Sequence, residues 1–238
     1  MSTRATYSIA ERGYQKRNEW GQRQATFYIH HDGYPEGAAH RFAMMIESRV
    51  EPSEEPFSGI VRKNGGWTFA FIRGNDEAGM TESHEVHGDA EYRYHVAWAD
   101  GWTVNEDKQK ICYLHITAEK AVYPYMPGID TPHSEWPEDA HIKAWKPFFT
   151  GDIADFIMKY RNKDWGTPLI CVAKEYSKYT KKVTHQYATH DTRNHLIDWN
   201  LKKMETFDDK NPNKATYARN AEMWSEAEIP ITGDSSWG

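Results

Sequence analysis

Two His-x-Thr tripeptides are the most direct candidates for chemistry in this 238-residue chain. His115 and Thr117 form the first tripeptide, and His190 and Thr192 form the second. Paired histidines can act as general base and general acid, while the threonine hydroxyls hold a phosphate group. The first copy lies within an apolar strand pattern, whereas the second lies where a helix is expected to begin.

The paired tripeptides resemble those of two-histidine phosphodiesterases, in which H-x-[S/T] motifs occupy adjacent strands. This resemblance implies a phosphate-handling enzyme that uses His115. The second copy departs from the pattern, because Thr189 and Arg193 stand where apolar flanks are expected. With 12 histidines in the chain, chance alone accounts for two such tripeptides. We therefore expect His115 to be a packed or hydrogen-bonded strand residue, and not a catalytic one.

The segment 30–37, HHDGYPEG, forms a dense turn signal between a strand pattern and a helical pattern. Free N–H groups at a helix start carry partial positive charge and suit an anion. The candidate anion-binding residues at this corner are Arg4, His30, His31, Asp32, Gly33, Tyr34 and Gly37. The alternative is a purely structural turn, because turn chemistry by itself accounts for the Gly, Pro and Asp residues.

The opening MSTRATYSI and the later FYIHHDGYPEGAA resemble a family of uncharacterised bacteriophage and prophage proteins. The resemblance covers residues 1–48, and it implies a phage-type accessory protein in the host-cell cytoplasm but no particular reaction. We therefore expect a protein without catalysis and without a cofactor. Its expected partner is a host protein or protein–nucleic-acid complex, and one such role is inhibition of a defence or nucleic-acid-processing complex.

Two segments are candidates for binding that partner. The Pro-rich segment 123–147 supplies aromatic residues of the kind that anchor interfaces, namely Tyr123, Tyr125, Trp136 and Trp145. The segment 174–182 interleaves cations with rings, a pattern that holds single-stranded nucleic acid. Its candidate residues are Lys174, Tyr176, Lys178, Tyr179, Lys181 and Lys182. An edge strand protected by lysines is the alternative explanation for the second segment.

The remaining histidines and the two cysteines predict neither a metal site nor a redox pair. His84 and His87 lie in a Gly-bearing polar loop, so we interpret them as solvated loop residues. The chain has no HExxH sequence and no cysteine pair at ligand spacing. Cys112 and Cys171 are expected to be reduced thiols of a cytosolic protein.

Composition limits the fold and the location of the protein. The chain has a net charge of −6 and only four leucines against 10 tryptophans and 14 tyrosines, which favours an aromatic-cored globule over a leucine-rich bundle. No run of 18 apolar residues predicts a membrane-spanning helix. Residues 1–30 lack the apolar region of a signal peptide.

The hydrophobic periodicity predicts an α+β protein with a mainly antiparallel sheet and two or three packed helices. The predicted strands are 4–10, 24–31, 67–71, 92–98, 102–104, 110–118 and 169–172, with a hairpin turn at 99–101. The predicted helices are 36–48, 151–162 (capped by Thr150) and 192–205, followed by a loose tail over the last 25 residues. Residues 1–148 form the expected core domain, and residues 149–238 form a mixed part that belongs to it or stands beside it.

Overall fold

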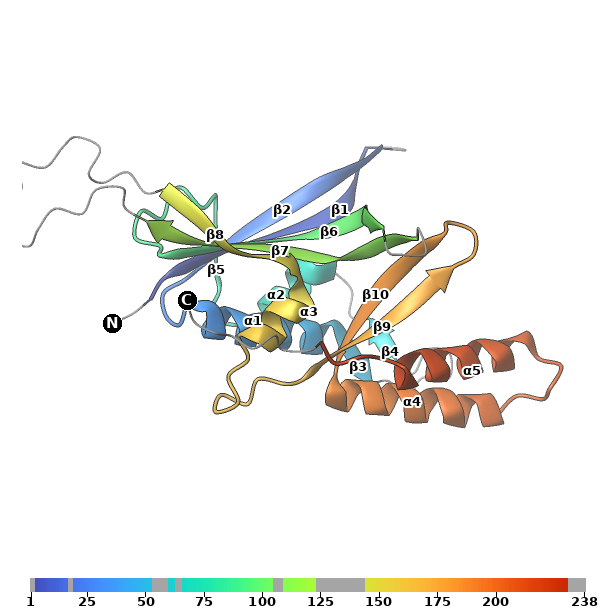
Figure 1. Ribbon diagram of the computed structural model, residues 1–238. Helices are drawn as coiled ribbons and strands as arrows, with labels where there is room; N and C mark the ends of the chain where they lie inside the picture. Colours follow the sequence, from blue (N-terminus) through green and yellow to red (C-terminus); the bar gives the residue numbers. More distant parts are fainter. Residues whose placement is uncertain are drawn as a thin grey trace, which may run out of the picture.

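A computed structural model describes residues 3–16, 19–52, 60–62, 66–104, 109–122 and 144–230. Its main feature is an eight-stranded sheet with the order β5-β2-β1-β6-β7-β10-β9, and β8 pairs with β7 outside this path (Figure 1). The strands are β1 (Ala5–Lys16), β2 (Glu19–Ile29), β5 (Gly79–Thr81), β6 (Tyr92–Val104), β7 (Lys110–Val122), β8 (Ala144–Asp152), β9 (Ile170–Ser177) and β10 (Lys182–Thr189). A separate two-stranded sheet joins β3 (Val50–Pro52) to β4 (Ile60–Arg62).

The pairing within the large sheet is mixed but mostly antiparallel. Only the β1–β6 and β7–β10 pairs run parallel among the described strands. The helices of the described chain are α1 (Pro35–Arg49), α2 (Gly66–Gly74), α3 (Ile153–Lys159), α4 (His190–Glu205) and α5 (Pro212–Ser225). The predicted α+β class is confirmed.

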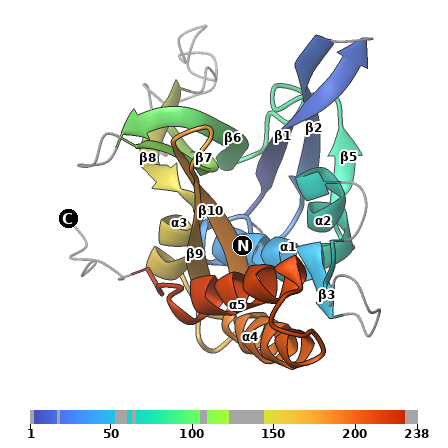
Figure 2. The ribbon, with the colours of Figure 1, turned by 90° about the vertical axis from the view of Figure 1, so that its right-hand side faces the viewer.

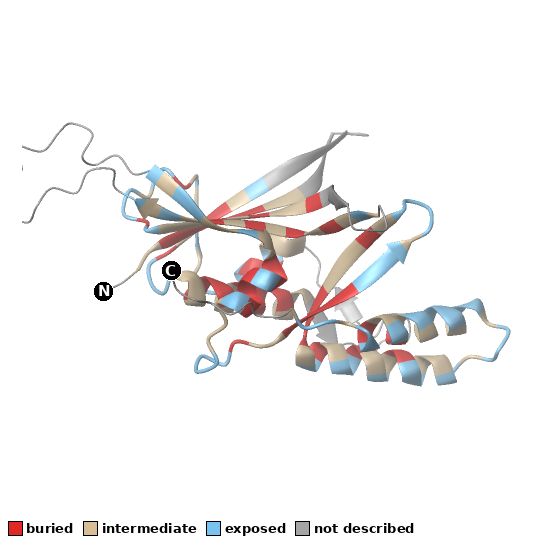
Figure 3. Cartoon of the chain, viewed as in Figure 1, coloured by how far each residue is buried: buried red, intermediate tan, exposed pale blue. Residues whose placement is uncertain are grey.

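One face of the sheet packs on α1, α2 and α3 through aromatic side chains. Tyr7 of β1 stacks on Tyr94 of β6 with ring centroids 5.0 Å apart, and Phe42 of α1 contacts both rings. Phe156 of α3 extends this cluster, and all four side chains are fully buried. Figure 3 shows the buried positions concentrated between the sheet and these helices. Large rings therefore supply the apolar area that four leucines cannot.

Helices α4 and α5 form a hairpin beside β9 and β10 (Figure 2). A small second core joins them to the strands, made of Ala173, Ala188, Leu196 and Trp224. After α5 the chain returns to the edge of β9, where Val172 and Glu228 exchange two backbone hydrogen bonds of 2.8 and 3.0 Å. The helical hairpin is thus fixed to the sheet at both of its ends.

Several predicted elements are wrong in detail. Residues 66–74 are a helix and not a strand, and a carboxylate of Glu11 on β1 accepts the Trp67 N–H in its first turn. Residues 92–104 are one strand with an irregularity between Asp100 and Thr103 in place of a hairpin turn. Most of α5 lies within the expected loose tail. The N-cap of α3 is Asp152, whose carboxylate accepts the Ala154 N–H at 2.8 Å.

No helix in the described ranges is long and apolar enough to cross a membrane. Cys112 and Cys171 are both buried, and neither forms a disulfide.

Candidate functional site

The large sheet divides at β7, because two strands, β8 and β10, pair with different parts of the same edge of β7. The first part of β7 (110–112) pairs with β10, whereas residues 115–122 pair with β8 on the same edge. At the point of division neither β8 nor β10 pairs with Leu114 on this edge of β7, and the Leu114 N–H donates to the hydroxyl of Tyr187, at 2.9 Å. We call this junction the fork.

Asp152 is the centre of the fork. Its Oδ2 accepts hydrogen bonds from His185 Nδ1 at 2.8 Å and from the Tyr187 hydroxyl at 3.0 Å. Because a carboxylate can only accept, the proton of neutral His185 must reside on Nδ1, which leaves Nε2 as the basic nitrogen. Burial raises the pKa of Tyr187 well above its ordinary value, so this hydroxyl stays protonated as a donor. The fork therefore holds an oriented Asp–His pair.

His115 lies opposite Asp152 in the β7–β8 register. Its Nε2 lies 3.1 Å from the Thr150 hydroxyl, and its Nδ1 lies 3.3 Å from the Tyr113 hydroxyl. Partial burial lowers the pKa of His115, while the Asp152 carboxylate acts in the opposite direction. His115 is thus a hydrogen-bonded strand residue on the sheet face opposite its buried neighbours, as predicted.

The second His-x-Thr tripeptide occupies a different place. Its Thr192 lies in the first turn of α4, where Thr189 is the N-cap and both hydroxyls donate to the carboxylate of Glu47 on α1. His190 begins the helix and donates its backbone N–H to the Leu169 carbonyl at 2.9 Å. The structure therefore places Asp152, and through it His185, near His115. Thr192 lies elsewhere, in the first turn of α4 behind the N-cap Thr189.

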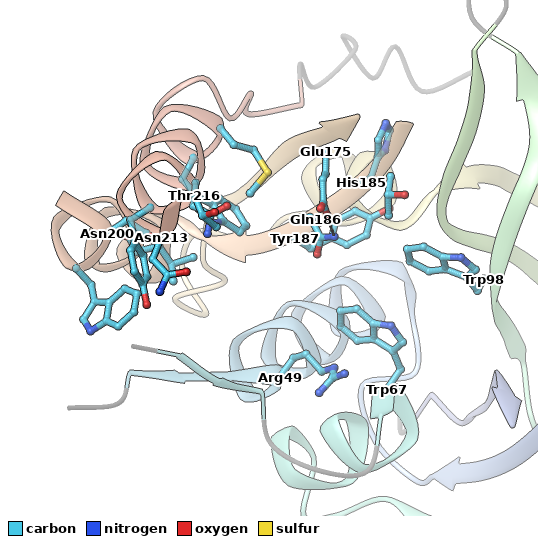
Figure 4. A pocket seen from close by; sticks show the side chains of 17 residues that line it. Arg49, Trp67, Trp98, Glu175, His185, Gln186, Tyr187, Asn200, Asn213 and Thr216 are labelled. Carbon is cyan, nitrogen blue, oxygen red and sulfur yellow. Dashed lines mark hydrogen bonds between the residues drawn. The ribbon is translucent and has the colours of Figure 1, made fainter. Parts of the chain in front are cut away.

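A cavity of about 630 Å³ opens beside the fork, between β10, the α4–α5 hairpin and the ends of α1 and α2 (Figure 4). His185, Gln186 and Tyr187 contribute one wall, and Arg49 and Trp67 lie across from them. Aromatic and amide side chains dominate the rest of the lining, namely Trp98, Trp199, Tyr217, Trp224, Asn200, Asn213 and Asn220. Apart from its tryptophan and tyrosine rings the lining is largely polar, so the cavity is more polar than the mainly apolar pockets that bind most small ligands.

Asn200 is the most constrained polar residue of this cavity. Its side chain is 2% exposed, and its Nδ2 donates to the Leu196 carbonyl at 2.7 Å. Its Oδ1 is buried and has no hydrogen-bond partner within the described part of the chain. An unsatisfied buried acceptor is costly, and this oxygen is closed off from the cavity as well as from protein donors of the described chain.

The β9–β10 hairpin carries the predicted basic and aromatic segment. Tyr179 at its tip is 99% exposed and Tyr176 is 44% exposed. Lys178 and Lys181 are exposed beside them, whereas Lys174 pairs with Glu228 at 2.8 Å. Glu175 of the same hairpin lines the cavity, so the tip and the cavity are neighbours along one element.

The segment 30–37 is held by structural contacts. Gly33 donates its N–H to the Thr3 carbonyl at 3.0 Å, and its carbonyl accepts from the buried Tyr94 hydroxyl at 2.8 Å. Asp32 is the residue that adopts the left-handed conformation, with φ of 54°. A side chain at Gly33 would collide with Ala5, so close packing and not a positive φ requires this glycine.

The other residues of the proposed anion corner are only partly brought together: Asp32 and Gly37 line one cavity of about 410 Å³, whereas the remaining side chains contact neighbouring elements. Arg4 pairs with Asp89 at 3.3 Å, and the ring of Tyr34 packs 5.6 Å from that of Trp165. His30 and His31 are exposed. The Asp32 carbonyl oxygen lies so close to Gly37, in the first turn of α1, that a side chain does not fit at this position.

The prediction of solvated loop histidines is wrong for His84. This residue is 6% exposed, and its Nδ1 lies 2.5 Å from the Thr6 hydroxyl. Its Nε2 lies 3.2 Å from His95 Nδ1. The loop after β5 is therefore attached to the sheet through Thr6 of β1 and His95 of β6. His87 is half-buried and stacks on Tyr28 with centroids 3.8 Å apart.

The proposed aromatic partner surface falls mostly beyond the described ranges, because Tyr123, Tyr125 and Trp136 lie outside them. Trp145 lies on β8, half-buried, with the Arg93 guanidinium 4.6 Å above its ring. Within the described ranges, no group of three or more His, Cys, Asp or Glu side chains is arranged to hold a metal ion.

Sequence reasoning did not single out Asp152, His185, Tyr187 or Asn200. The alternation of His185 and Tyr187 on one face of a strand was a usable signal, but the position of Asp152 depends on how β8 and β10 meet. No protein-family model, curated protein or solved structure matches this chain, so its own geometry is the basis for any functional conclusion.

Proposed function

We propose that this protein is a non-catalytic, phage-type accessory protein that binds a host protein–nucleic-acid complex in the host cytoplasm through the β9–β10 hairpin. The observation that supports this most directly is the exposure of Tyr176 and Tyr179 beside the exposed cations Lys178 and Lys181. Rings that stack on bases, with cations that neutralise phosphates, are the two components of single-strand binding.

The distribution of charge favours binding of nucleic acid at one local element over binding to the whole surface. The whole chain carries a net charge of −6, which opposes general attraction to a polyanion. The hairpin tip concentrates positive charge at one projecting element, so any nucleic acid is steered to this element. The cavity that Glu175 and His185 line begins on the same hairpin, which provides a place for specific recognition.

The test is the binding of a fluorescently labelled 12-nucleotide single strand, measured by anisotropy at two salt concentrations. The triple variant is Lys178→Gln, Tyr179→Ser, Lys181→Asn, which removes two cations and the exposed ring from the tip. Asparagine is chosen at position 181 because it tolerates the φ of 55° there. We expect a loss of at least about tenfold in affinity, together with a smaller salt dependence.

A matched control removes two exposed lysines elsewhere, Lys163→Gln with Lys202→Gln. It changes the net charge by the same amount and is expected to bind within about twofold of the wild type. Absence of wild-type binding to single strands, or equal loss in both variants, would refute the hairpin as the recognition element.

A phosphate-handling enzyme is a second candidate, with His185 as the general base in place of the His115 that the sequence suggested, because Asp152 orients His185. In this form the Nε2 of His185 takes a proton from the water molecule that attacks the phosphorus of a phosphodiester. The bond from phosphorus to the leaving oxygen then breaks, and that oxygen receives the proton from His185 to leave as an alcohol. The assay incubates the purified protein with cyclic nucleotides, 2′,3′-cyclic phosphates and phosphodiester oligonucleotides. If the enzyme proposal holds, His185→Gln abolishes turnover and His190→Gln does not. No turnover on any of these substrates would exclude this chemistry.

A further inference from the structure

The cavity of about 410 Å³ lies where the start of α1 meets the end of α2 and the loop after α3. We propose that this cavity binds a guanidinium group, carried either by a free small molecule or by an exposed arginine of a partner protein. The inference does not rest on the hairpin function, because no residue of the β9–β10 hairpin lines this cavity within the described chain.

Asn75 supplies the first argument, because it presents an acceptor to the cavity that it lines. The residue is 4% exposed, and its Nδ2 donates to the Phe71 carbonyl of α2 at 2.8 Å and to the Arg41 carbonyl of α1 at 3.2 Å. Both partners can only accept, so the amide nitrogen must face them and the oxygen must face away. The Oδ1 atom accepts no hydrogen bond within the described ranges, and it is not among the unpartnered atoms that the protein closes off from solvent there. This buried side chain therefore offers a fixed and open acceptor to a ligand.

The charges of the lining supply the second argument. The cavity is lined by three carboxylates, those of Asp32, Asp76 and Glu77. Its one permanent cation among the described residues is Arg41, which lies 3.3 Å from Glu77 and leaves Asp32 and Asp76 without an ion-pair partner in that part of the chain. His40 adds no further cation near neutral pH, because burial and the nearby Arg41 lower its pKa. The lining is therefore net negative, which favours a cation over an anion.

The spread of these charges and the ring of Trp165 favour a guanidinium over a metal ion. In the described ranges, no three His, Cys, Asp or Glu side chains converge closely enough to hold a metal ion, so these carboxylates suit a larger, delocalised charge. Trp165 lines the same cavity and is 37% exposed, and Tyr34 and His40 pack against it at 5.6 and 6.3 Å between ring centroids. A planar guanidinium stacks on an indole ring, while its N–H donors serve carboxylate and amide oxygens.

The experiment titrates two guanidinium probes into the purified protein, agmatine and an acetylated, amidated alanine–arginine–alanine peptide. Binding is followed by NMR through the indole N–H of Trp165 and the side-chain amide of Asn75. We expect both probes to bind saturably and to shift both signals. The peptide with neutral citrulline in place of arginine should bind at least about tenfold more weakly, since it loses the charge but keeps the shape. The tighter of the two guanidinium probes identifies the source, agmatine a free small molecule and the peptide an arginine of a partner.

A double variant locates the site. Asp32→Asn with Asp76→Asn removes the two unpaired carboxylates at exposed positions, and asparagine tolerates the φ of 54° at position 32. We expect this variant to weaken agmatine binding by about tenfold, and Trp165→Ala to weaken it by about threefold. The matched control, Asp191→Asn with Asp198→Asn, changes the net charge equally at exposed positions of α4 outside the lining. It should bind agmatine within about twofold of the wild type.

Three results would overturn the inference: no saturable binding of agmatine, equal affinity for the arginine and citrulline peptides, or equal loss of binding in the two double variants. Saturable binding of inorganic phosphate that shifts the same two signals would show that the cavity is an anion site and would refute the inference as well. The hairpin triple variant should bind agmatine as the wild type does, so failure of the guanidinium site and failure of the hairpin function are separate results.

Discussion

Replacement of Gly33 by valine is expected to lower the free energy of unfolding by about 3 kcal/mol or more, measured by chemical denaturation. A Cβ at this position would lie 2.6 Å from the Ala5 Cβ and 2.8 Å from backbone atoms of Arg4 and Ala5. These atoms belong to the start of β1, which is hydrogen-bonded on both sides, so they cannot move aside at low cost. The substitution also disturbs the bond from the Tyr94 hydroxyl to the Gly33 carbonyl.

Gly88 provides the matched control for this prediction. A Cβ on Gly88 meets nothing within 4 Å, and Gly88→Val is therefore expected to change stability by no more than about 0.5 kcal/mol. Gly37→Ala should resemble Gly33→Val, because its Cβ would lie 1.8 Å from the Asp32 carbonyl oxygen. If Gly33→Val melts together with the wild type, then the close packing of the turn against β1 is not a source of stability.

Acidification is expected to destabilise the protein through His84 before most carboxylates titrate. Burial, together with the neighbouring His95 and Arg93, lowers the pKa of His84 from 6.5 to about 4, and Glu85 opposes the effect only in part. The unfolded state therefore binds a proton as the pH falls below 6.5, whereas the folded state stays neutral until about pH 4. The stabilisation is complete above pH 6.5 and decreases by about 2 kcal/mol between pH 7.5 and pH 5.

The variant His84→Gln isolates this contribution. Glutamine retains a hydrogen-bonding group near Thr6 but does not titrate, so the difference in stability between variant and wild type should shrink as the pH falls from 7.5 to 5. His190→Gln serves as the control, because this residue lies half-exposed at the start of α4. Parallel pH profiles for the wild type and His84→Gln would contradict the assignment. Burial and the neighbouring Arg93 also lower the pKa of His95. The pH profile of the wild type therefore contains a contribution of the same sign from His95.

The elements that carry a regular apolar period could be predicted from the sequence. The alternation in β1, β2 and β7 and the helical stripes of α1, α3 and α4 are local patterns, and they fixed the α+β class. The turn at 30–37 was also recognisable, because glycine and proline restrict the backbone wherever they occur. The sequence likewise indicated that His115 lies on the less buried face of its strand.

Other features depended on contacts between distant residues. Trp67, Phe69 and Phe71 alternate as in a strand, yet they lie on a helix whose first turn is hydrogen-bonded to Glu11 of β1. The same holds for the site: Asp152, His185 and Leu114 meet only because β8 and β10 share one edge of β7. The position of Asn200 on its helix is unremarkable in the sequence. Only the tertiary structure shows that its side-chain oxygen is buried without a partner in the described chain. Local periodicity thus determined which elements form, whereas the fork and the cavity were decided by long-range pairing, which no local pattern encodes.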